Sequence, residues 1–317
     1  MPTVEYAGTT CELQENESVL DGLLRAGESI PYSCKSGNCG SCLMQATTRE
    51  AVPARAQLGL KDAWKAAGYF LACVCHPAQD LIATAVGAET KIAAAIVSLD
   101  RLSDTVLRVR LITESPFEYR AGQYLTLLRD GLARSYSIAS LPTDGAIELH
   151  VRLLPNGRMG QWLASEARPH RLGSAELHVQ GPSGDCFYLR GREDQTLLLA
   201  GTGTGLAPLY GIARDALRHG HRGPVQLFHG AATAAGLYLQ QELAALAHAH
   251  ENFIYTPTVL ATDGPIDQAV LTRFPKLQGH RAFLCGDPAI VQSLKRKLFV
   301  GGAALNDIHA DAFLPSV

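Results

Sequence analysis

The pattern of hydrophobic and polar positions changes twice along the chain. Residues 1–88 mix short strands with an amphipathic helix, residues 92–190 contain many strand-like segments separated by Gly, Pro and Asp, and residues 194–317 alternate apolar strands with helices. The second pattern is typical of an antiparallel β-barrel, and the third of a parallel α/β sheet wound by crossover helices. We therefore expect three domains with these boundaries, the first two joined by a short polar linker at 87–91.

The first segment contains the signals of several short elements. TVEYAG and TCELQ indicate a hairpin, LMQAT, FLACVC and LIATAV indicate further strands, and a helix is expected around residues 57–66. Ser18 and Asp21 have the spacing of a helix start, and the apolar positions that follow them share one helical face. That face contains Val19, Leu20, Leu23 and Leu24, and Gly27 ends the helix.

The second and third segments differ in how strands and helices are ordered. The expected barrel strands are KIAAAIVSLD, VLRVRLIT, QYLTLLR, SYSIAS, IELHVRLL and AELHVQGP, with one helix that starts just after Gly160. The expected parallel strands are TLLLA, VQLFHG, FIYTPTVL and RAFLCGDP, with helices at LYGIARDALRHG and around residues 235–249. The predicted fold class is a multidomain protein with α+β, β and α/β parts.

Composition excludes some classes of function. The 317 residues are 47% hydrophobic and 18% charged, as in ordinary globular proteins, and the net charge of −2 supplies no basic surface for nucleic acid. The N-terminus lacks a basic and apolar leader, and no apolar run is long enough to span a bilayer. We therefore expect a cytoplasmic protein that binds neither nucleic acid nor membrane, and a monomer because each domain can be internally complete.

Four cysteines carry the strongest chemical signal. Cys34, Cys39 and Cys42 are spaced C-x4-C-x2-C, and Cys73 follows in YFLACVC. Thiolates are soft ligands for iron and sulfide, and this is the plant-type [2Fe–2S] spacing. A zinc site or a disulfide pair is the alternative, but zinc loops usually show two C-x2-C-like pairs and this chain has one. Cys75 is a rival fourth ligand, because Cys73 and Cys75 would share one face of a strand.

The cysteine segment resembles the plant-type ferredoxin family. In that family the fourth cysteine follows a Leu-Ala or Leu-Thr pair, and Leu71-Ala72-Cys73 matches this position. The resemblance implies a β-grasp fold and a [2Fe–2S] cluster bound by four cysteines. These metal ligands are Cys34, Cys39, Cys42 and Cys73.

The barrel segment carries a second resemblance. Arg134-Ser135-Tyr136-Ser137 resembles the flavin-binding strand R-x-Y-[ST] of the ferredoxin–NADP reductase family. The resemblance implies an FAD site in which Arg134 binds the diphosphate, Tyr136 covers the isoalloxazine and Ser137 meets flavin N5. Further FAD contacts are implied on the neighbouring strand and at a helix start. These residues are His150, Val151, Arg152, Gly157, Arg158, Met159 and Gly160, of which Gly160 departs from the family's usual Ser or Thr.

The third segment carries two motifs of the same reductase family. GTGTGLAP does not satisfy G-x-G-x-x-G, but a glycine turn that leads into a helix exposes backbone N–H groups to a pyrophosphate. It resembles the family's G-G-T-G-x-x-P segment, and CGDP resembles its C-G-x-P segment. The implied nucleotide contacts are Gly201, Thr202, Gly203, Thr204, Gly205, Pro208, Cys285, Gly286, Asp287 and Pro288.

The same resemblance assigns catalytic positions and bears on the choice of nucleotide. Cys285 would lie near nicotinamide C4, and Phe313 would cover the flavin face as a gate, so these two residues and Ser137 form the predicted catalytic set. A 2′-phosphate needs a basic residue near the end of the second strand, and AATAAGLYLQQEL after VQLFHG contains none. NADH is therefore expected over NADPH, with Arg214 and Arg218 as the residues that could change this preference.

The order of the three segments resembles the reductase components of bacterial oxygenases. The resemblance implies that NADH gives hydride to FAD, and that single electrons pass through the cluster to a terminal oxygenase, either a Rieske dioxygenase or a diiron monooxygenase. A reductase of deoxysugar biosynthesis has the same domain order and is an alternative. From another class, the chain could be a non-catalytic iron–sulfur electron carrier or a redox sensor, although the intact motifs argue against both.

Overall fold

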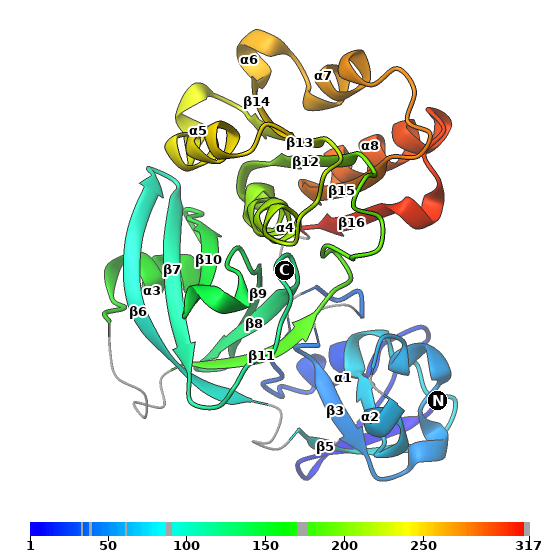
Figure 1. Ribbon diagram of the computed structural model, residues 1–317. Coiled ribbons are helices and arrows are strands. Elements are labelled where there is room, and N and C mark those ends of the chain that lie inside the picture. The colour runs from blue at the N-terminus through cyan, green and yellow to red at the C-terminus, as the bar shows by residue number, and fades with distance from the viewer. Residues whose placement is uncertain (33, 38–39, 61, 87–90, 170–176, 314–317) are drawn as a thin grey trace.

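The computed structural model describes residues 1–32, 34–37, 40–60, 62–86, 91–169 and 177–313. The strands form three sheets that follow one another along the chain (Figure 1). We refer to them as the N-terminal unit (residues 3–85), the barrel unit (92–183) and the C-terminal unit (197–312). The fold class predicted from the sequence is confirmed, whereas several element boundaries differ.

The N-terminal unit is a five-stranded sheet that packs against one helix. Its strands are β1 (Thr3–Tyr6), β2 (Thr9–Glu12), β3 (Leu43–Ala46), β4 (Tyr69–Leu71) and β5 (Leu81–Ala85). They lie in the order β2-β1-β5-β3-β4, and β1 and β2 form the predicted antiparallel hairpin. Helix α1 (Val19–Arg25) begins as predicted, because the Ser18 hydroxyl accepts a hydrogen bond from the Asp21 amide at 3.2 Å.

Two parts of this unit differ from the prediction. FLACVC is not one strand, since β4 is followed by a single 3-10 turn, η3 (Ala72–Val74). The helix expected around residues 57–66 is divided into η2 (Ala54–Gln57) and α2 (Asp62–Ala66), and a third short turn, η1 (Arg49–Ala51), precedes them. Gly59 lies between η2 and α2 with φ of +78°, a left-handed conformation that a helix cannot contain.

The barrel unit is an antiparallel sheet that curls on itself. Its strands are β6 (Ile92–Ser103), β7 (Val106–Thr113), β8 (Tyr124–Arg129), β9 (Leu132–Ser137), β10 (Ile147–Arg152) and β11 (His178–Ser183). In the order β10-β7-β6-β11-β8-β9, the long β6 pairs with β7 over most of its length and with β11 only at Ile92 and Ala93. Helix α3 (Arg158–Ser165) packs Met159 and Leu163 into the barrel core, and it begins two residues before Gly160, earlier than predicted.

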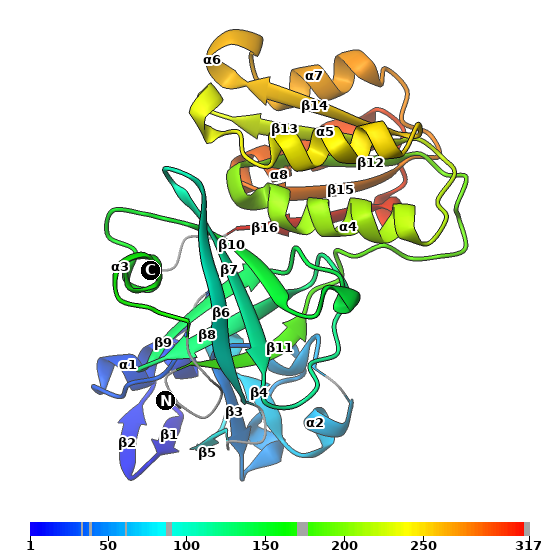
Figure 2. The same cartoon turned by 60° about the vertical axis from the view of Figure 1, so that its left-hand side comes forward.

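The C-terminal unit is a parallel sheet in the order β14-β13-β12-β15-β16. Its strands are β12 (Leu197–Thr202), β13 (Val225–Ala231), β14 (Phe253–Val259), β15 (Arg281–Gly286) and β16 (Ile308–Ala312). Its helices are α4 (Leu206–Arg218), α5 (Gln240–Ala249), α6 (Leu260–Asp263), α7 (Ile266–Arg273) and α8 (Pro288–Val300), with 3-10 turns η6 (Gly203–Gly205), η7 (Ala234–Gly236) and η8 (Leu305–Asp307). Helices α4 and α5 cover one face of the sheet, and α7 and α8 cover the other (Figure 2). Helix α5 begins at Gln240, later than predicted.

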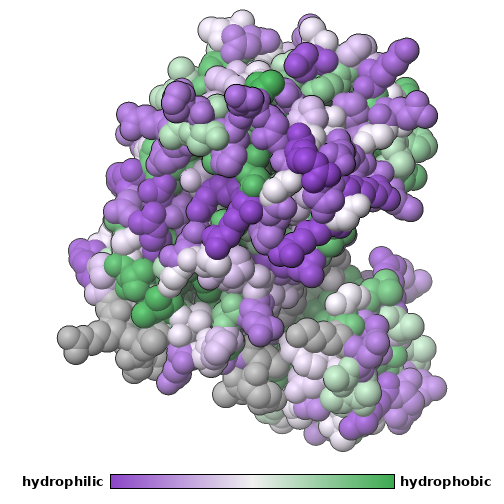
Figure 3. All heavy atoms as spheres, in the orientation of Figure 1, coloured by the Kyte–Doolittle hydropathy of each residue, from purple (hydrophilic) through white to green (hydrophobic). Residues whose placement is uncertain are grey.

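The barrel unit and the C-terminal unit meet along a polar seam. The Arg214 guanidinium on α4 donates two hydrogen bonds, of 2.8 and 2.9 Å, to the Asp144 carboxylate on η5 (Pro142–Asp144). Arg108 on β7 forms an ion pair of 3.1 Å with Glu242 in the first turn of α5. Hydrophilic side chains gather over the middle of the face that carries α4 (Figure 3). Pairs of opposite charge therefore link these two units.

Candidate functional site

Three of the four predicted cluster ligands lie around the loop that follows α1. The Cys73 amide lies 3.5 Å from the Cys42 sulfur, and the Ser36 amide lies 3.4 Å from the Cys34 sulfur. Backbone N–H groups that point at cysteine sulfur are the contacts that tune the thiolates of an iron–sulfur cluster. A hydrogen bond with Cys42 lowers the pKa of the Cys73 thiol. Cys39 lies outside the described residues.

The 3-10 turn η3 separates the two candidates for the fourth ligand. It brings Cys73 beside Cys42, whose carbonyl accepts a hydrogen bond from the Ala72 amide at 3.1 Å. Cys75 is fully buried beneath the start of α1, where its carbonyl accepts from the Val19 amide, and burial raises the pKa of its thiol to about 12. The described residues, which do not include Cys39, contain no group of three His, Cys, Asp or Glu side chains that could hold a metal ion. The donor set itself, soft thiols with N–H donors beside them, fits a cluster.

The predicted flavin strand is β9, and its side chains differ in their surroundings. Arg134 is half-buried, and its Nη1 donates to the Ala133 carbonyl at 2.7 Å. Within the described part of the chain no acidic side chain pairs with Arg134, so its charge is available for an anion such as a diphosphate. Tyr136 packs against the barrel core, and burial raises the pKa of its hydroxyl. These surroundings fit the phosphate and ring of a flavin nucleotide.

Several of the other predicted flavin contacts can be made only by backbone atoms. The side chains of Val151 and Met159 are buried in the barrel core, whereas Arg152 and Arg158 are exposed. Gly157 is the N-cap of α3 and has no side chain to cap it. The first amides of α3 are therefore suited to an external anion.

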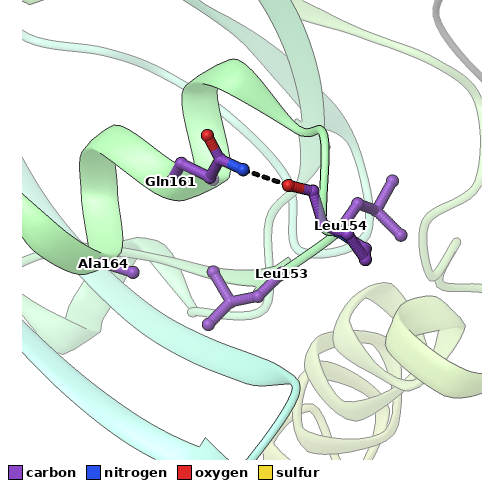
Figure 4. A pocket seen from close by; sticks show the side chains of 6 residues that line it. Leu153, Leu154, Gln161 and Ala164 are labelled. Carbon is purple, nitrogen blue, oxygen red and sulfur yellow. Dashed lines mark hydrogen bonds between the residues drawn. The ribbon is translucent and has the colours of Figure 1, made fainter.

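A cavity of about 300 Å³ lies beside this helix start (Figure 4). Leu154 and Ala164 form part of its wall, and the Gln161 side-chain amide donates to the Pro155 carbonyl. Gly160 also lines the cavity, and a Cβ added to Gly160 would meet no atom closer than 3.5 Å, an ordinary contact. A small side chain at this position would therefore fit without a steric clash at its Cβ.

The two predicted nucleotide motifs meet at the carboxyl edge of the parallel sheet. Gly205 packs so closely on β15 that a Cβ there would lie 2.2 Å from the Cys285 carbonyl oxygen, so only glycine fits. The Asp287 amide donates to the Thr202 hydroxyl at 3.1 Å, and the Asp287 carboxylate caps the first amides of α8. The same edge holds the remaining predicted contacts, Gly201, Gly203, Thr204, Pro208, Gly286 and Pro288.

The predicted catalytic residues meet at the seam between the barrel unit and the C-terminal unit. The Ser137 hydroxyl donates to the Asp311 carboxylate at 3.0 Å, and Asp311 on β16 is the register partner of Cys285 on β15. The Phe313 amide donates to the Gly286 carbonyl at 2.8 Å. Burial raises the pKa of Asp311 to about 6 and raises the pKa of the Cys285 thiol well above its usual value. A hydroxyl, a carboxyl, a thiol and an aromatic residue thus share one junction.

The structure adds Asp311 to this junction, and it shows which residue the His150 side chain contacts. Asp311 was not predicted, although it lies in HADAF, only two residues before Phe313. His150 was predicted to lie beside the flavin, but its ring is fully buried and lies 3.1 Å from the Tyr238 hydroxyl. Any flavin contact at His150 therefore falls to its backbone.

The fold and these sites define a flavin and iron–sulfur oxidoreductase of the ferredoxin reductase type. Family models match in the order predicted from the sequence. The 2Fe-2S iron-sulfur cluster binding domain matches residues 3–78, the oxidoreductase FAD-binding domain matches 93–188, and the oxidoreductase NAD-binding domain matches 199–296. The three predicted cofactors, [2Fe–2S], FAD and NAD, each have a domain in the chain.

Several known proteins similar to the chain are reductase components of oxygenase systems. The chain is 30% identical to the phenol hydroxylase P5 protein of Acinetobacter pittii, with 98% of this chain and 94% of that protein covered. It is 32% identical to the reductase component of the naphthalene 1,2-dioxygenase system of Pseudomonas putida, with 94% of each covered. The crystal structure of the Amycolatopsis cytochrome P450 reductase GcoB matches with a TM-score of 0.70 at 29% identity, with both chains covered completely. The chain belongs to the family of three-domain reductase components that transfer electrons to oxygenases.

Proposed function

We propose that this reductase accepts hydride from NADH at the seam and delivers single electrons to a terminal oxygenase through the cysteine loop of the N-terminal unit. The observation that carries the proposal is the 3.0 Å hydrogen bond between Ser137 and Asp311. This bond joins the flavin strand β9 to β16, where Asp311 is the register partner of Cys285 on β15. Bound FAD supplies the exchange between a two-electron hydride and single electrons.

The cluster ligands in this proposal are Cys34, Cys39, Cys42 and Cys73. Cys73 is preferred over Cys75, since the Cys73 amide contacts the Cys42 sulfur, whereas Cys75 is fully buried and burial raises the pKa of its thiol to about 12. The amides that approach the Cys34 and Cys42 sulfurs would stabilise thiolate ligands and so affect the reduction potential.

The FAD in this proposal lies along β9, β10 and the start of α3. Arg134 binds the diphosphate because its charge has no acidic partner among the described residues. Tyr136 covers the isoalloxazine, and the Ser137 hydroxyl, which donates its proton to Asp311, would accept a hydrogen bond from N5–H of the reduced flavin. The supporting contacts are His150, Val151, Arg152, Gly157, Arg158, Met159 and Gly160, mostly through their backbone.

The nicotinamide in this proposal binds against Cys285 and Asp311. Burial keeps the Cys285 thiol protonated by raising its pKa, so Cys285 shapes the pocket and does not act as a nucleophile. Phe313, fixed by its amide at Gly286, covers the flavin face and must move aside before the ring can stack. The pyrophosphate would meet the turn at Gly201–Gly205 and the first turn of α4, where Pro208 lies.

We also propose that NADH is preferred over NADPH. The chain has no Lys or Arg from residue 223 to residue 272, a stretch that includes the ends of β13 and β14. Arg214 donates hydrogen bonds to Asp144, and Arg218 donates one to Thr143, so both arginines form contacts between the C-terminal unit and the barrel unit. Without a cation near the adenosine ribose, a 2′-phosphate would have no partner.

The remaining parts of the proposal concern organisation. The domain boundaries are 1–88, 92–190 and 194–317, supported by three separate sheets, one for each domain. The chain acts in the cytoplasm, because an iron–sulfur protein requires thiols that stay reduced. It acts as a monomer, because each domain can be internally complete. Among the described residues, no helix has the length and apolar character needed to cross a bilayer.

The test is an anaerobic titration of the holoprotein with NADH and, separately, with NADPH. We expect NADH to bleach the flavin band and then the cluster band, with a catalytic efficiency well above that of NADPH. A flavin band that does not respond to NADH would leave only a carrier function, and a clear advantage of NADPH would refute the argument from charge. Transfer from the reduced protein to a purified Rieske dioxygenase or diiron monooxygenase then identifies the class of acceptor.

A further inference from the structure

A second buried cluster lies in the seam, apart from the Ser137–Asp311 junction. It contains Glu148 and His150 from β10, Tyr238 from the segment before α5, and His229 from β13. His150, Tyr238 and His229 are 3%, 2% and 0% exposed. Because β10 belongs to the barrel unit and the other two elements belong to the C-terminal unit, the cluster exists only when these units are packed together. In both ribbon views β10 lies close to the C-terminal unit (Figures 1 and 2).

On the barrel side of the cluster, a donor and an acceptor can be assigned to each hydrogen bond. Glu148 lies 3.3 Å from Arg108 and 3.0 Å from Arg110, and its pKa falls to about 2 because the hydrogen bond with His150 and these charges outweigh its burial. His150 Nε2 lies 3.0 Å from this carboxylate and must donate to it. Burial lowers the pKa of His150, so the ring is neutral and its Nδ1 accepts from the Tyr238 hydroxyl at 3.1 Å.

On the C-terminal side the cluster reaches the glycine turn. His229 Nε2 lies 3.2 Å from the Gly203 carbonyl and donates to it, and burial lowers the pKa of His229 to about 4, so this ring is also neutral. The Tyr238 ring packs edge-on against both histidines, with ring centres 5.3 Å from His150 and 5.4 Å from His229. Tyr238 therefore lies between strand β10 and the turn proposed to bind the pyrophosphate.

The backbone around Tyr238 is held in an unusual conformation. Leu239 follows it with φ of +56° and ψ of 24°, a left-handed conformation that is unfavourable for leucine. Strained backbone of this kind persists where the surrounding structure fixes it, often at functional sites. Arg108, which forms an ion pair with Glu148, also forms an ion pair with Glu242 in the first turn of α5. The segment that carries Tyr238 is thus attached to the barrel unit at two points.

We propose that Tyr238 is a positioning residue for hydride transfer, which keeps the flavin-binding strand β10 and the nucleotide-binding turn at a fixed separation. Its hydroxyl bonds to His150 in one unit, and its ring packs against His229, which holds Gly203, in the other. The inference rests on the proposed function for the placement of FAD and nucleotide. Hydride transfer requires reacting atoms in contact and aligned, so loss of this bond slows the reaction without touching either ligand.

The experiment compares Tyr238→Phe with Tyr255→Phe in the full-length holoprotein. Tyr255 is the matched control, because its hydroxyl lies 3.5 Å from His229 Nδ1 but both residues belong to the C-terminal unit. Stopped-flow reduction by NADH gives the flavin reduction rate constant and the Kd for NADH, each normalised to bound FAD. We expect Tyr238→Phe to lower the rate constant roughly three- to tenfold with an unchanged Kd, as for the loss of one buried hydrogen bond. Tyr255→Phe should behave as the wild type.

Each other outcome contradicts the inference. A normal rate constant in Tyr238→Phe would show that the bond does not position the reactants. An effect on the Kd alone would make Tyr238 a nucleotide-binding residue, and an equal loss of rate in both variants would point to general loosening of the C-terminal unit. If the wild type itself is not reduced by NADH, the proposed function fails instead, so the two failures are distinguishable.

Discussion

Replacing Asp311 by asparagine tests whether a negative charge at the seam assists hydride transfer. Asp311 accepts the Ser137 hydrogen bond at 3.0 Å and lies beside Cys285 in the β15–β16 pair. The side-chain oxygen of asparagine can still accept from Ser137, so the substitution removes the charge and keeps the contact. A nicotinamide ring becomes cationic when it gives up hydride, and an ionised carboxyl beside it stabilises that charge as it develops.

The expected size of the effect follows from the pKa of Asp311. Burial, with the like charge of Asp185 acting in the same direction, raises this pKa from 3.8 to about 6. The difference corresponds to about 3 kcal/mol for ionising the carboxyl in the folded protein. If a developing cation recovers about half of this cost, the rate changes roughly tenfold. Cys285, the other ionisable group that faces Asp311, stays protonated because burial raises its pKa.

The sign for stability is the reverse of the usual case for aspartate. A raised pKa means that the folded protein binds this proton more tightly than the unfolded chain does. The stability that Asp311 contributes is therefore fully present below pH 3.8 and is lost as the pH rises through about 6. Above pH 6 the Asp311→Asn variant should unfold at a higher temperature than the wild type, and the difference should shrink towards pH 4.

The assay is stopped-flow reduction of the bound flavin at saturating NADH from pH 5 to pH 8. The wild-type rate constant should rise roughly tenfold as the pH passes about 6. The Asp311→Asn variant should show no such step and should stay near the low-pH value of the wild type. A wild-type profile without a step, or a step that survives in the variant, would refute the role given to this carboxyl.

Four further substitutions test the cofactor sites. Cys73→Ser should abolish the visible cluster absorbance yet leave NADH oxidation with ferricyanide intact. Cys75→Ser should keep the cluster absorbance. If Cys75→Ser lost the cluster and Cys73→Ser kept it, Cys75 would be the fourth ligand instead of Cys73. Arg134→Ala should weaken FAD binding roughly 10- to 100-fold, measured by flavin retention on dilution, because a charged hydrogen-bond donor is lost; full retention would disprove the placement of the diphosphate. Gly160→Ser should fit without strain, since its Cβ meets nothing closer than 3.5 Å, and should hold FAD several-fold more tightly; a lower affinity would argue against a diphosphate near Gly160.

Much of the fold could be predicted because its signals are local. The antiparallel hairpin, the Ser18 cap and four of the five strands of the third segment follow from residue types only a few positions apart, whereas β16 was not predicted. The cysteine spacing is likewise local, because three ligands come from one loop. Element ends were predicted less well. Helix α5 begins after Leu239, whose left-handed backbone is a conformation that a leucine in the sequence does not signal.

The residues that sequence reasoning missed depend on contacts between distant parts of the chain. Ser137 and Asp311 are 174 positions apart, and His150 and Tyr238 are 88 apart, so no spacing within either segment could pair them. Strand periodicity treats Cys73 and Cys75 alike, and the choice of Cys73 came from the family resemblance alone. The structure adds a geometric reason, because the turn η3 brings Cys73 beside Cys42 whereas Cys75 is fully buried.

The way the cores are divided matches the two kinds of electron transfer in the proposal. Val106 and Tyr188, from outside the parallel sheet, are buried in the same apolar cluster as Leu199 and Cys285, so the barrel unit and the C-terminal unit share a core as well as a polar seam. The buried core of the N-terminal unit contains only residues 4–83. Hydride transfer needs a rigid stack of two rings, which a shared core provides. Passing one electron forms no bond between the cluster and its acceptor, so the unit that carries the cysteines can keep a separate core and adjust its position towards an oxygenase without disturbing the hydride site.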